Sequence, residues 1–502
     1  MNLPLQSLQK TYGPWIAAQN KYVVDLVCLT ALAILVIFPG LGQLRFCTSH
    51  EVLHAETIRE MAESGDYVET KILGERIPDK PPVMHAQAAL LTHWFGQPSM
   101  FLARFPSALA ALLGVLATYG IGRVMLNRQA ALFGAMALLG IPGYSLLARQ
   151  VLPDMTLCAW ILFSCLGLVL GMRSVKTSSR VLYLAAAGFA AGIAVLTKGP
   201  LGLLFPVFFV VLAPIGRPEF KRPRFSWLVF GASFIVAAGI WAIPAYLRDQ
   251  GVYLNQVLFQ PDLNLATIVK DKPFYKLIGV ALLHSLPFSI FLPLAIWDWR
   301  RYAYSPLLAV AAAILLTFVC VPKKRDHYLL PMYPFLMLGV AASIVRHGEK
   351  NRFVRRTAMT LVPLSLVSYP LFFTVIQPLA LPDGDPEIRF AREALPIIGP
   401  SSRVYCIDVH DEVIAWVGKR YEGIVQLRLH LPADVDQLRQ APNGSFLFTD
   451  RDRVEGILEA AGPLPLKEVL SRPVRKKTWV LFRLGMDPKN PLGLCPAIGS
   501  GE

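Results

Sequence analysis

Apolar stretches about as long as a membrane-crossing helix recur along most of this chain and are separated by short polar segments. A helix needs about 20 residues to cross the hydrocarbon core of a bilayer. On that criterion the sequence predicts about eleven spans, at residues 23–44, 101–122, 130–148, 155–172, 181–198, 199–215, 226–247, 277–297, 305–321, 328–345 and 358–378. The first stretch has no small-residue cleavage site before Arg45, which favours a retained anchor over a cleaved signal peptide. The pattern therefore predicts a polytopic α-helical membrane protein.

The pattern changes after Leu379, where short strand-like and helix-like stretches alternate behind the linker LPDGDP. The helix-like stretches are EIRFAREAL, EVIAWVGKR and RVEGILEAAG, and the strand-like ones are RVYCIDV, SFLFTD and TWVLFRL. This alternation predicts a small α/β domain over residues 380–502, after a transmembrane domain over residues 1–379. The later segment has no Gly-rich phosphate loop and no His/Cys cluster, which favours a structural or acceptor-guiding role for it.

Composition and charge fix the expected orientation. The chain is 54% hydrophobic and 17% charged, with a formal net charge of +15, which excludes a single soluble globule with an ordinary surface. The basic side chains gather in alternate connections: Lys10 and Lys21; Arg123 and Arg128; Arg173, Lys176 and Arg180; Arg217, Lys221, Arg222 and Arg224; Arg300 and Arg301; and Arg346, Lys350, Arg352, Arg355 and Arg356. The positive-inside rule makes that side cytoplasmic. The charge is then a signal of topology and of contact with anionic membrane lipids, and not of nucleic-acid binding.

This orientation places four polar segments on the outer, periplasmic side: residues 45–100, the turn at Asp154, residues 248–275 and the chain after about residue 380. Within the first of them, HAETIREMAESG predicts a juxtamembrane helix that ends near Gly65. Beyond it, Pro81-Pro82 holds Asp79 and Lys80 in an extended presentation. Such a carboxylate could accept a proton and such a lysine could neutralise a phosphate, although a surface ion pair worth little is the structural alternative.

Other charged side chains on the outer side are costly unless they face a partner or water. Lys198 lies between two apolar runs, Arg149 precedes VLPDM, and Asp154 begins the next span. Lys323, Lys324 and Arg325 form a basic cluster against the positive-inside trend, directly before DHYLLPMYP. Cations gathered at a membrane surface favour an anionic ligand, and a lipid-linked phosphate is the one the sequence predicts.

Histidines and cysteines give weaker indications. His50 and His54 are spaced i, i+4 beside Glu51, and His284 lies in the eighth predicted span, so a divalent metal is one interpretation and a hydrogen-bonded core histidine is the alternative. No cofactor is required by the pattern. Cys28, Cys158, Cys165 and Cys320 fall in spans, whereas Cys47, Cys406 and Cys495 fall outside them, and a Cys406–Cys495 disulfide is compatible with an oxidising compartment.

Several motifs in fixed order resemble the bacterial aminoarabinose and protein O-mannosyltransferase superfamily over residues 20–380. They are SHEVLHAETIREMAESGDYV, DKPP, FGQPSMFLARFPSALAALLG, VLPDM, LTKGPLGLL, HSLPFSIFLPL and KKRDHYLLPMYP. The resemblance implies the multi-helix GT-C fold and transfer of a sugar, with inversion, from a polyprenyl-phosphate donor to a lipid, protein or glycan acceptor on the periplasmic side of the inner membrane. It also implies a carboxylate base in the first outer loop and positive groups on the donor phosphate.

The resemblance assigns roles position by position. Lys80 matches a donor-phosphate ligand and Asp79 a sugar or metal ligand, while Asp154, Lys198, Arg149 and the 323–325 cluster match positions facing the donor. Tyr328 and Tyr333 match residues that could cap the cavity, with interfacial anchoring as the alternative. The superfamily's first-loop aspartate is His50 here, followed by Glu51. Either Glu51 or His50 then serves as the base, or this chain has another acceptor or is inactive.

Three classes of function follow from these features. A lipid-linked glycosyltransferase is favoured by the order of the motifs and by the outer-side charges. A transporter would show paired repeats with interrupted helices, and the sequence has no such repeat. A noncatalytic membrane scaffold is favoured by His50 alone.

Overall fold

The structure is a computed structural model. It describes residues 5–42, 49–72, 74–77, 80–96, 98–215, 217, 219–220, 226–258, 274–299, 301, 305–320, 325–380, 386–399, 402–409, 413, 417, 424–426 and 432–485. The chain forms two compact units, each described by itself below. The first comprises Met1–Gln43, Ser64–Thr70 and Ile77–Gln377, and the second comprises Leu44–Glu63, Lys71–Arg76 and Pro378–Glu502.

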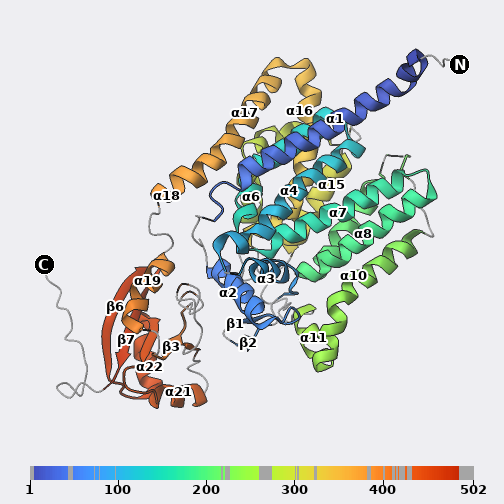
Figure 1. Ribbon diagram of the computed structural model, residues 1–502. Helices are drawn as coiled ribbons and strands as arrows, with labels where there is room; N and C mark the ends of the chain where they lie inside the picture. The colour runs from blue at the N-terminus through green and yellow to red at the C-terminus, as the bar shows by residue number, and fades with distance from the viewer. Residues whose placement is uncertain are drawn as a thin grey trace. The chain divides into compact units, whose positions relative to one another are not determined.

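The first unit is built from helices (Figure 1). They are α1 (Leu5–Ile37), α3 (Val83–Phe95), α4 (Met100–Met125), α5 (Arg128–Leu139), α6 (Pro142–Ser145), η1 (Leu147–Arg149), α7 (Pro153–Arg173), α8 (Thr177–Lys198), α9 (Leu201–Leu212), α10 (Ser226–Asp249), α11 (Val252–Leu258), α13 (Phe274–His284), η2 (Phe288–Phe291), α14 (Leu292–Asp298), α15 (Ser305–Cys320), η3 (Asp326–Met332), α16 (Tyr333–Lys350), α17 (Arg352–Leu371) and the π-helical turn η4 (Phe372–Ile376). The short helix α18 (Gln377–Ala380) follows at the boundary of the unit.

Membrane-length apolar helices confirm the predicted helical membrane protein. Among the described residues, six helices are long and apolar enough to cross a bilayer, and two bent pairs, with angles of 64° and 107°, bring the number to eight if each pair is one span. Every predicted window overlaps a helix or a bent pair. Leu201–Leu212 and Pro306–Cys320 are shorter apolar helices. The count of eleven spans therefore stays a prediction.

Three glycines let α7, α8 and α10 approach closely, and these helices lie side by side in Figure 1. On α7, a Cβ added at Gly167 would come within 2.8 Å of the Tyr183 carbonyl oxygen of α8. On α8, a Cβ added at Gly188 would overlap the Phe230 carbonyl oxygen of α10, and one at Gly192 would lie 2.6 Å from Ala237. Small residues four apart are the usual means of close helix packing in membranes.

A buried ionic group attaches α1 to the bundle. Asp25 of α1 accepts hydrogen bonds from Arg128 Nε at 2.7 Å and from the Tyr119 hydroxyl at 2.6 Å. Tyr22 stacks on the Tyr119 ring, with centroids 5.8 Å apart. A carboxylate inside an apolar bundle is costly unless it is paired, so this group fixes α1 against α4 and α5.

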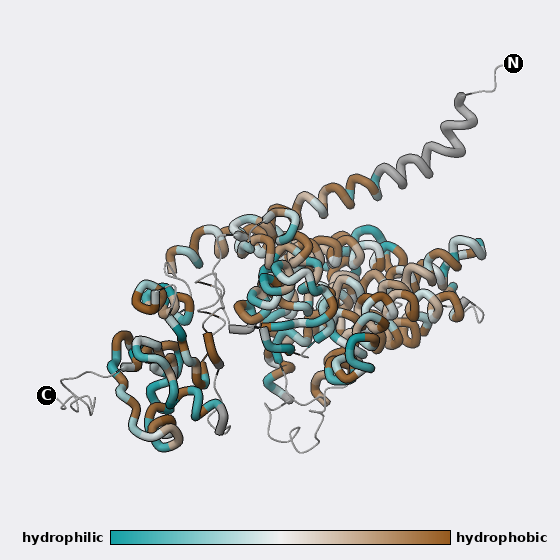
Figure 2. The backbone as a smooth tube through the Cα atoms, turned by 60° about the horizontal axis from the view of Figure 1, so that its bottom comes forward, coloured by the Kyte–Doolittle hydropathy of each residue, from teal (hydrophilic) through white to brown (hydrophobic). Residues whose placement is uncertain are grey.

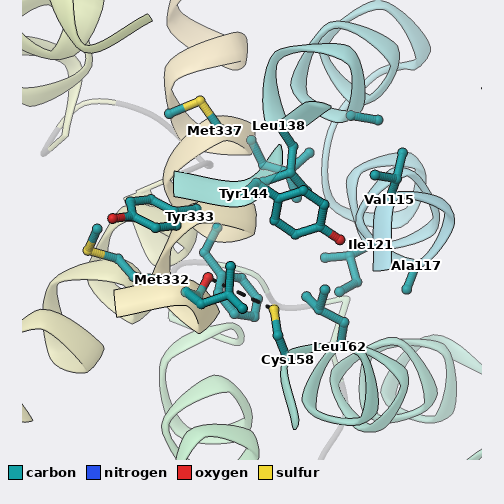
Figure 3. Close-up of a cluster of buried hydrophobic side chains, with 14 of the residues drawn as sticks. Val115, Ala117, Ile121, Leu138, Tyr144, Cys158, Leu162, Met332, Tyr333 and Met337 are labelled. Carbon is teal, nitrogen blue, oxygen red and sulfur yellow. Dashed lines mark hydrogen bonds between the residues drawn. The ribbon is translucent and has the colours of Figure 1, made fainter. Parts of the chain in front are cut away.

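Aromatic and sulfur side chains fill the middle of the first unit (Figure 3). Tyr144 is fully buried and donates to the Ala111 carbonyl at 2.7 Å. Cys158 is directed toward the Leu330 carbonyl at 3.9 Å. Tyr333 is also fully buried, so the interfacial anchoring considered for it from sequence is wrong, because its ring lies in the core between α6 and α16.

The second unit contains α2 (Ser49–Ser64), the hairpin strands β1 (Lys71–Ile72) and β2 (Glu75–Arg76), and an α/β segment. That segment comprises α19 (Pro386–Ile398), β3 (Val404–Ile407), β4 (Ile424–Gln426), α21 (Pro432–Arg439), β5 (Phe446–Asp450), η5 (Arg451–Arg453), α22 (Val454–Ala461), β6 (Leu466–Val474) and β7 (Lys477–Leu484). Its sheet has the order β4-β3-β5-β7-β6, with β3, β4 and β5 parallel and β7 antiparallel to both of its neighbours. Brown and teal alternate along this segment in Figure 2, as expected for elements with one buried face.

Helices cover both faces of this sheet. Phe390 of α19 stacks on Phe448 of β5 with centroids 5.0 Å apart, and Trp479 of β7 packs edge-on against both rings. Leu438 of α21 and Ile457 of α22 lie in a separate buried cluster with the side chains of the opposite face. The predicted helix EVIAWVGKR and Cys495 fall mostly or wholly outside the described residues, so the Cys406–Cys495 pairing stays a prediction.

The contact at Gly188 yields a stability prediction. Gly188→Ala should lower the thermal unfolding midpoint, because its methyl group meets backbone of α10 that cannot move cheaply, at a cost of about 1–3 kcal/mol. Gly231→Ala on α10 is the matched control, since nothing lies within 4 Å of a Cβ there and alanine favours helix. Equal midpoints for the two variants in detergent would contradict the close packing of α8 on α10.

Candidate functional site

A buried ion pair joins the start of α7 to the end of α8. Pro153 and Asp154 open α7, and Lys198 is the last residue of α8 before Gly199, whose φ of 73° ends the helix. Lys198 Nζ lies 2.5 Å from Asp154 Oδ1, and the two side chains are 10% and 4% exposed. A carboxylate is favoured at a helix N-terminus and an ammonium at a C-terminus, so the antiparallel helices place each charge at the end that stabilises it.

The side chains of His327 and Tyr328, neighbours on η3, cover this pair. Lys198 Nζ lies 4.2 Å from the centroid of the Tyr328 ring, and the Phe318 ring of α15 packs on Tyr328 with centroids 5.4 Å apart. His327 Nε2 is 3.9 Å from Asp154 Oδ2, and its ring meets the Tyr328 ring edge-on at 4.9 Å. The Asp154 carboxylate is thus approached by Lys198 on one oxygen and by His327 on the other.

Further cations surround the pair. Lys80 is close enough for its charge to act on both Asp154 and His327, and the charge of the exposed Arg325 acts on His327. Asp326, which precedes His327 in the chain, is exposed, and its charge acts on His284 and Tyr333. The described part of the site therefore has three permanent cations, Lys80, Lys198 and Arg325, and one carboxylate, Asp154. We refer to Lys80, Asp154, Lys198, Arg325, His327 and Tyr328 as the cation site. Its positive balance, beside apolar helices, suits an anionic group such as a phosphate.

Backbone anchors hold the loop that leads to Lys80. The Tyr253 hydroxyl of α11 accepts from the Thr70 amide at 2.9 Å, and Trp241 Nε1 of α10 donates to the Val68 carbonyl at 2.8 Å. Two hydrogen bonds join Thr70 to Ile77. The Ile77 amide donates to the Thr70 carbonyl at 2.9 Å, and the Thr70 hydroxyl donates to the Ile77 carbonyl at 2.5 Å. These contacts fix residue 77, three positions before Lys80, on the scaffold of α10 and α11.

Asp66 adds an ionic anchor to the same loop. Arg248 NH1 of α10 donates to Asp66 Oδ2 at 2.6 Å, and the Val68 amide donates to Oδ1 at 3.1 Å. Partial burial alone would raise the pKa of Asp66, but the hydrogen bonds from Arg248 and from the Val68 amide outweigh it and hold the pKa below its usual value. The anchor is therefore ionised and intact at neutral pH.

Arg149, predicted to face the donor, binds backbone at the end of α1. Its guanidinium donates to the carbonyls of Ile37 and of Pro39, the latter at 2.5 Å, and lies 4.1 Å above the Phe373 ring. These contacts satisfy carbonyls that a helix C-terminus leaves without partners. A role for Arg149 in donor binding stays a prediction.

The first-loop helix α2 is buried along most of its length although it is rich in charge. Glu51 and His54 are buried within it, and Glu56 forms an ion pair with Arg59. Glu56 Oε2 has no hydrogen-bond partner among the described residues. Burial raises the pKa of Glu56 to about 7; Arg59 opposes this shift and Glu60 adds to it. Glu56 therefore titrates near neutral pH.

Several predicted residues lie outside what the structure describes. These are Asp79, Lys323, Lys324 and the side chain of His50. Their roles, like those of Glu51 and His54, stay predictions. Within the described ranges, no group of three or more His, Cys, Asp or Glu side chains could hold a metal ion. His284 lies at the end of α13, with its ring 6.4 Å from that of Tyr333.

Sequence reasoning missed two kinds of residue. His327 lies inside the motif KKRDHYLLPMYP, between two residues already singled out, so its position on the same short helix was an available signal. Tyr253 and Trp241 had no such signal, because each contacts a loop more than 170 positions earlier in the chain.

The buried hydroxyl of Tyr253 yields a prediction about loop order. Tyr253→Phe should remove the acceptor for the Thr70 amide at a cost of about 1–3 kcal/mol, and hydrogen exchange should speed up over residues 64–77. Tyr246→Phe, at an exposed position of α10, is the control. Unchanged exchange in Tyr253→Phe would show that this bond does not hold the loop.

The raised pKa of Glu56 predicts a pH-dependent stability. A carboxyl group whose folded-state pKa is raised from 4.5 to about 7 stabilises the fold fully below 4.5, and this contribution is lost as pH rises through 7. The loss is at most about 3 kcal/mol. Unfolding midpoints measured in detergent from pH 5 to 9 should fall less in Glu56→Gln than in the wild type. Glu455→Gln, at an exposed position of α22 that does not act on Glu56, should keep the wild-type slope, and a wild-type slope in Glu56→Gln would refute the assignment.

Known proteins share both sequence and fold with this chain. The family described as dolichyl-phosphate-mannose-protein mannosyltransferase matches residues 79–241. An undecaprenyl phosphate-alpha-4-amino-4-deoxy-L-arabinose arabinosyl transferase of Aeromonas salmonicida (strain A449) is 29% identical over 315 residues, which cover 60% of this chain and 57% of the relative. One from Proteus mirabilis (strain HI4320) is 26% identical over 301 residues, covering 57% and 54%. The chain thus matches little more than half the length of these curated relatives.

Solved structures extend the likeness over almost the whole chain. ArnT from Cupriavidus metallidurans in the apo state has a TM-score of 0.74 at 19% identity, covering 93% of this chain and 98% of that one. The same protein bound to undecaprenyl phosphate has a TM-score of 0.69, covering 91% and 97%. The resemblance predicted from the ordered motifs is therefore confirmed, and this chain has the fold of the GT-C superfamily of membrane glycosyltransferases.

Proposed function

We propose that this protein is a membrane glycosyltransferase that moves a sugar from a polyprenyl-phosphate donor to an acceptor. The observation that carries the proposal is the cation site, where Lys198 is fixed against the buried Asp154 beside Lys80 and Arg325. A sugar linked through a phosphate to a long apolar chain combines an anion with a hydrocarbon tail. The cations of the site suit the phosphate of such a donor, and the apolar helices beside them suit its hydrocarbon chain.

The names of the relatives support a polyprenyl-phosphate sugar as the donor. The curated relatives are named as transferases of aminoarabinose from undecaprenyl phosphate, and the ArnT structure was obtained with undecaprenyl phosphate bound. The acceptor of this chain is proposed only as a class, namely lipid A, a protein hydroxyl or an envelope glycan.

The proposed reaction is a single displacement at the anomeric carbon. An acceptor oxygen forms the new bond to that carbon while the bond to the donor phosphate oxygen breaks, and the electron pair leaves with polyprenyl phosphate. Lys80, Lys198 and Arg325, with Lys323 and Lys324, stabilise the charge that develops on the leaving phosphate. Glu51 or His50 accepts the acceptor proton, an assignment argued from sequence. Asp79 and Asp154 orient the sugar, and Tyr328 caps the group.

The topology is part of the same proposal. We infer about eleven spans in the bacterial inner membrane, with the 45–100 loop and residues 380–502 on the periplasmic side, as the distribution of basic residues predicts. A divalent metal near His54 or His284 stays a proposal without a role in the displacement. A noncatalytic scaffold is the alternative that His50 favours, and turnover distinguishes the two.

Turnover measurements test the proposed function. Purified protein supplied with polyprenyl-phosphate sugars and an acceptor should release polyprenyl phosphate and glycosylate the acceptor. Lys80→Ala or Lys198→Gln should lower kcat about 100-fold because each removes a cation from the leaving group. Glu51→Gln should lower kcat with little change in unfolding midpoint if Glu51 is the base. Lys276→Gln, at an exposed position of α13, is the matched control and should keep full activity.

The results of these measurements distinguish a wrong site assignment from a wrong function. Full activity in Lys80→Ala and Lys198→Gln would reject the cation site as the donor site. Full activity in Glu51→Gln would move the role of base to His50. The absence of turnover with any polyprenyl-phosphate sugar, in native membranes as well as in detergent, would support the scaffold.

A further inference from the structure

Four arginines gather at the end of α7 and α8 opposite to the cation site. They are Arg123, Arg173, Arg180 and Arg217, here called the arginine cluster. At 1.5 Å per residue, α7 carries Arg173 about 30 Å from Asp154, which is the thickness of the hydrocarbon core of a bilayer. The arginine cluster therefore lies where these helices reach the other membrane surface.

Neighbouring carbonyl groups fix two of these guanidinium groups next to each other. Arg173 NH1 donates to the Val124 carbonyl at 2.8 Å, and Arg217 NH2 donates to the Met125 carbonyl at 2.8 Å. Both carbonyls belong to the last turn of α4, which has no further helical partners for them. Because the acceptors are adjacent in the chain, the two positive charges are held close together.

The other two arginines complete the group. Arg180 NH2 donates to the Ser174 carbonyl at 2.7 Å, which ties the start of α8 to the end of α7. Arg123 lies in the last turn of α4 itself. The Nε atoms of Arg123 and Arg180 are buried and have no hydrogen-bond partner among the described residues.

Positive charge is not balanced in this region. The connecting segments 123–128, 173–180 and 213–226 contain one acidic residue, Glu219, which lies 3.9 Å from Arg217 and is half-exposed. Asp25, from outside these segments, pairs with Arg128, and its charge also acts on Arg123 of the cluster. Burial lowers the pKa of Arg217; Glu219 partly offsets this, and the charge of Arg173 lowers it further. An additional anion would relieve the repulsion between the arginines.

Apolar side chains stand exposed beside the cluster. Val175 is 92% exposed between α7 and α8, Leu182 is 66% exposed on α8, and Ile215 is 58% exposed between α9 and Arg217. A free inorganic anion would gain nothing from these side chains. A phospholipid would place its phosphate on the arginines and its acyl chains on the apolar surface.

Capping of α4 accounts for only part of this arrangement. A helix C-terminus is stabilised by one nearby cation, and a lysine or a water molecule would satisfy its carbonyls. Capping does not explain why four arginines gather beside only two carboxylates among the described residues, Glu219 and the Asp25 already paired with Arg128, nor does it explain the apolar rim. Guanidinium groups held in a fixed geometry are, in contrast, the preferred ligands of phosphate.

We propose that the arginine cluster binds the phosphate of an anionic membrane phospholipid, whose acyl chains lie against Val175, Leu182 and Ile215. The bound lipid neutralises the arginines and thereby stabilises the packing of α4, α7 and α8. This inference does not depend on the proposed transferase activity, since it concerns the opposite end of these helices.

Lipid titration tests the proposal on the full chain in a neutral detergent. Phosphatidylglycerol should raise the unfolding midpoint and remain bound in native mass spectrometry, whereas phosphatidylcholine and inorganic phosphate should do neither. Arg173→Gln should weaken phosphatidylglycerol binding about tenfold, because it removes one charge-assisted contact. Arg173→Lys should lose less, and Arg352→Gln, at an exposed basic position of α17, should bind as the wild type does.

Each outcome decides the proposal. Equal binding of phosphatidylglycerol and phosphatidylcholine, or wild-type binding by Arg173→Gln, would overturn it. A full stabilising effect of inorganic phosphate alone would assign the cluster to a free anion and would also overturn the lipid assignment. If Arg173→Gln does not fold, Arg180→Gln provides the same comparison from α8.

Discussion

The buried ion pair between Asp154 and Lys198 is the interaction on which the rest of this structure depends. Two opposite charges at the ends of antiparallel helices are stable in an apolar bundle only while both are present, and removal of one partner from a buried pair costs about 3–5 kcal/mol. The pair therefore fixes the relative position of α7 and α8 as well as the charge of the site. Its location at a helix end gives it access to a ligand that a pair in the middle of the bundle would not have.

Packing elsewhere in the first unit holds the helices and the loop that position this pair. The glycine contacts of α8 hold it against α7 and α10, and α10 with α11 holds the loop that leads to Lys80. The aromatic layer of Tyr328 and Phe318 supports Lys198 from the other side. A cation whose neighbours are rigid needs little reorganisation when charge develops on a ligand, which is the usual source of electrostatic catalysis.

The sequence predicted the helical parts of this fold well because long apolar runs have few alternatives in a membrane. It also indicated several residues of the cation site, since Asp154, Lys198 and Tyr328 are charged or polar where an apolar side chain would be expected. It could not supply their partners, because the contact of Lys198 with Asp154 spans 44 positions and that of Thr70 with Tyr253 spans 183. Strands β4 and β6 were also missed, since β4 is three residues long and β6 carries four charged or proline residues among its nine.

The most direct test of the central claim is an experimental structure of this protein with a polyprenyl phosphate bound. We predict that the phosphate contacts Lys198 and Lys80, with Asp154 still paired to Lys198 or released from it by the ligand. A phosphate bound elsewhere, with the Asp154–Lys198 pair enclosed and out of contact with the lipid, would contradict the claim that this pair forms the donor site.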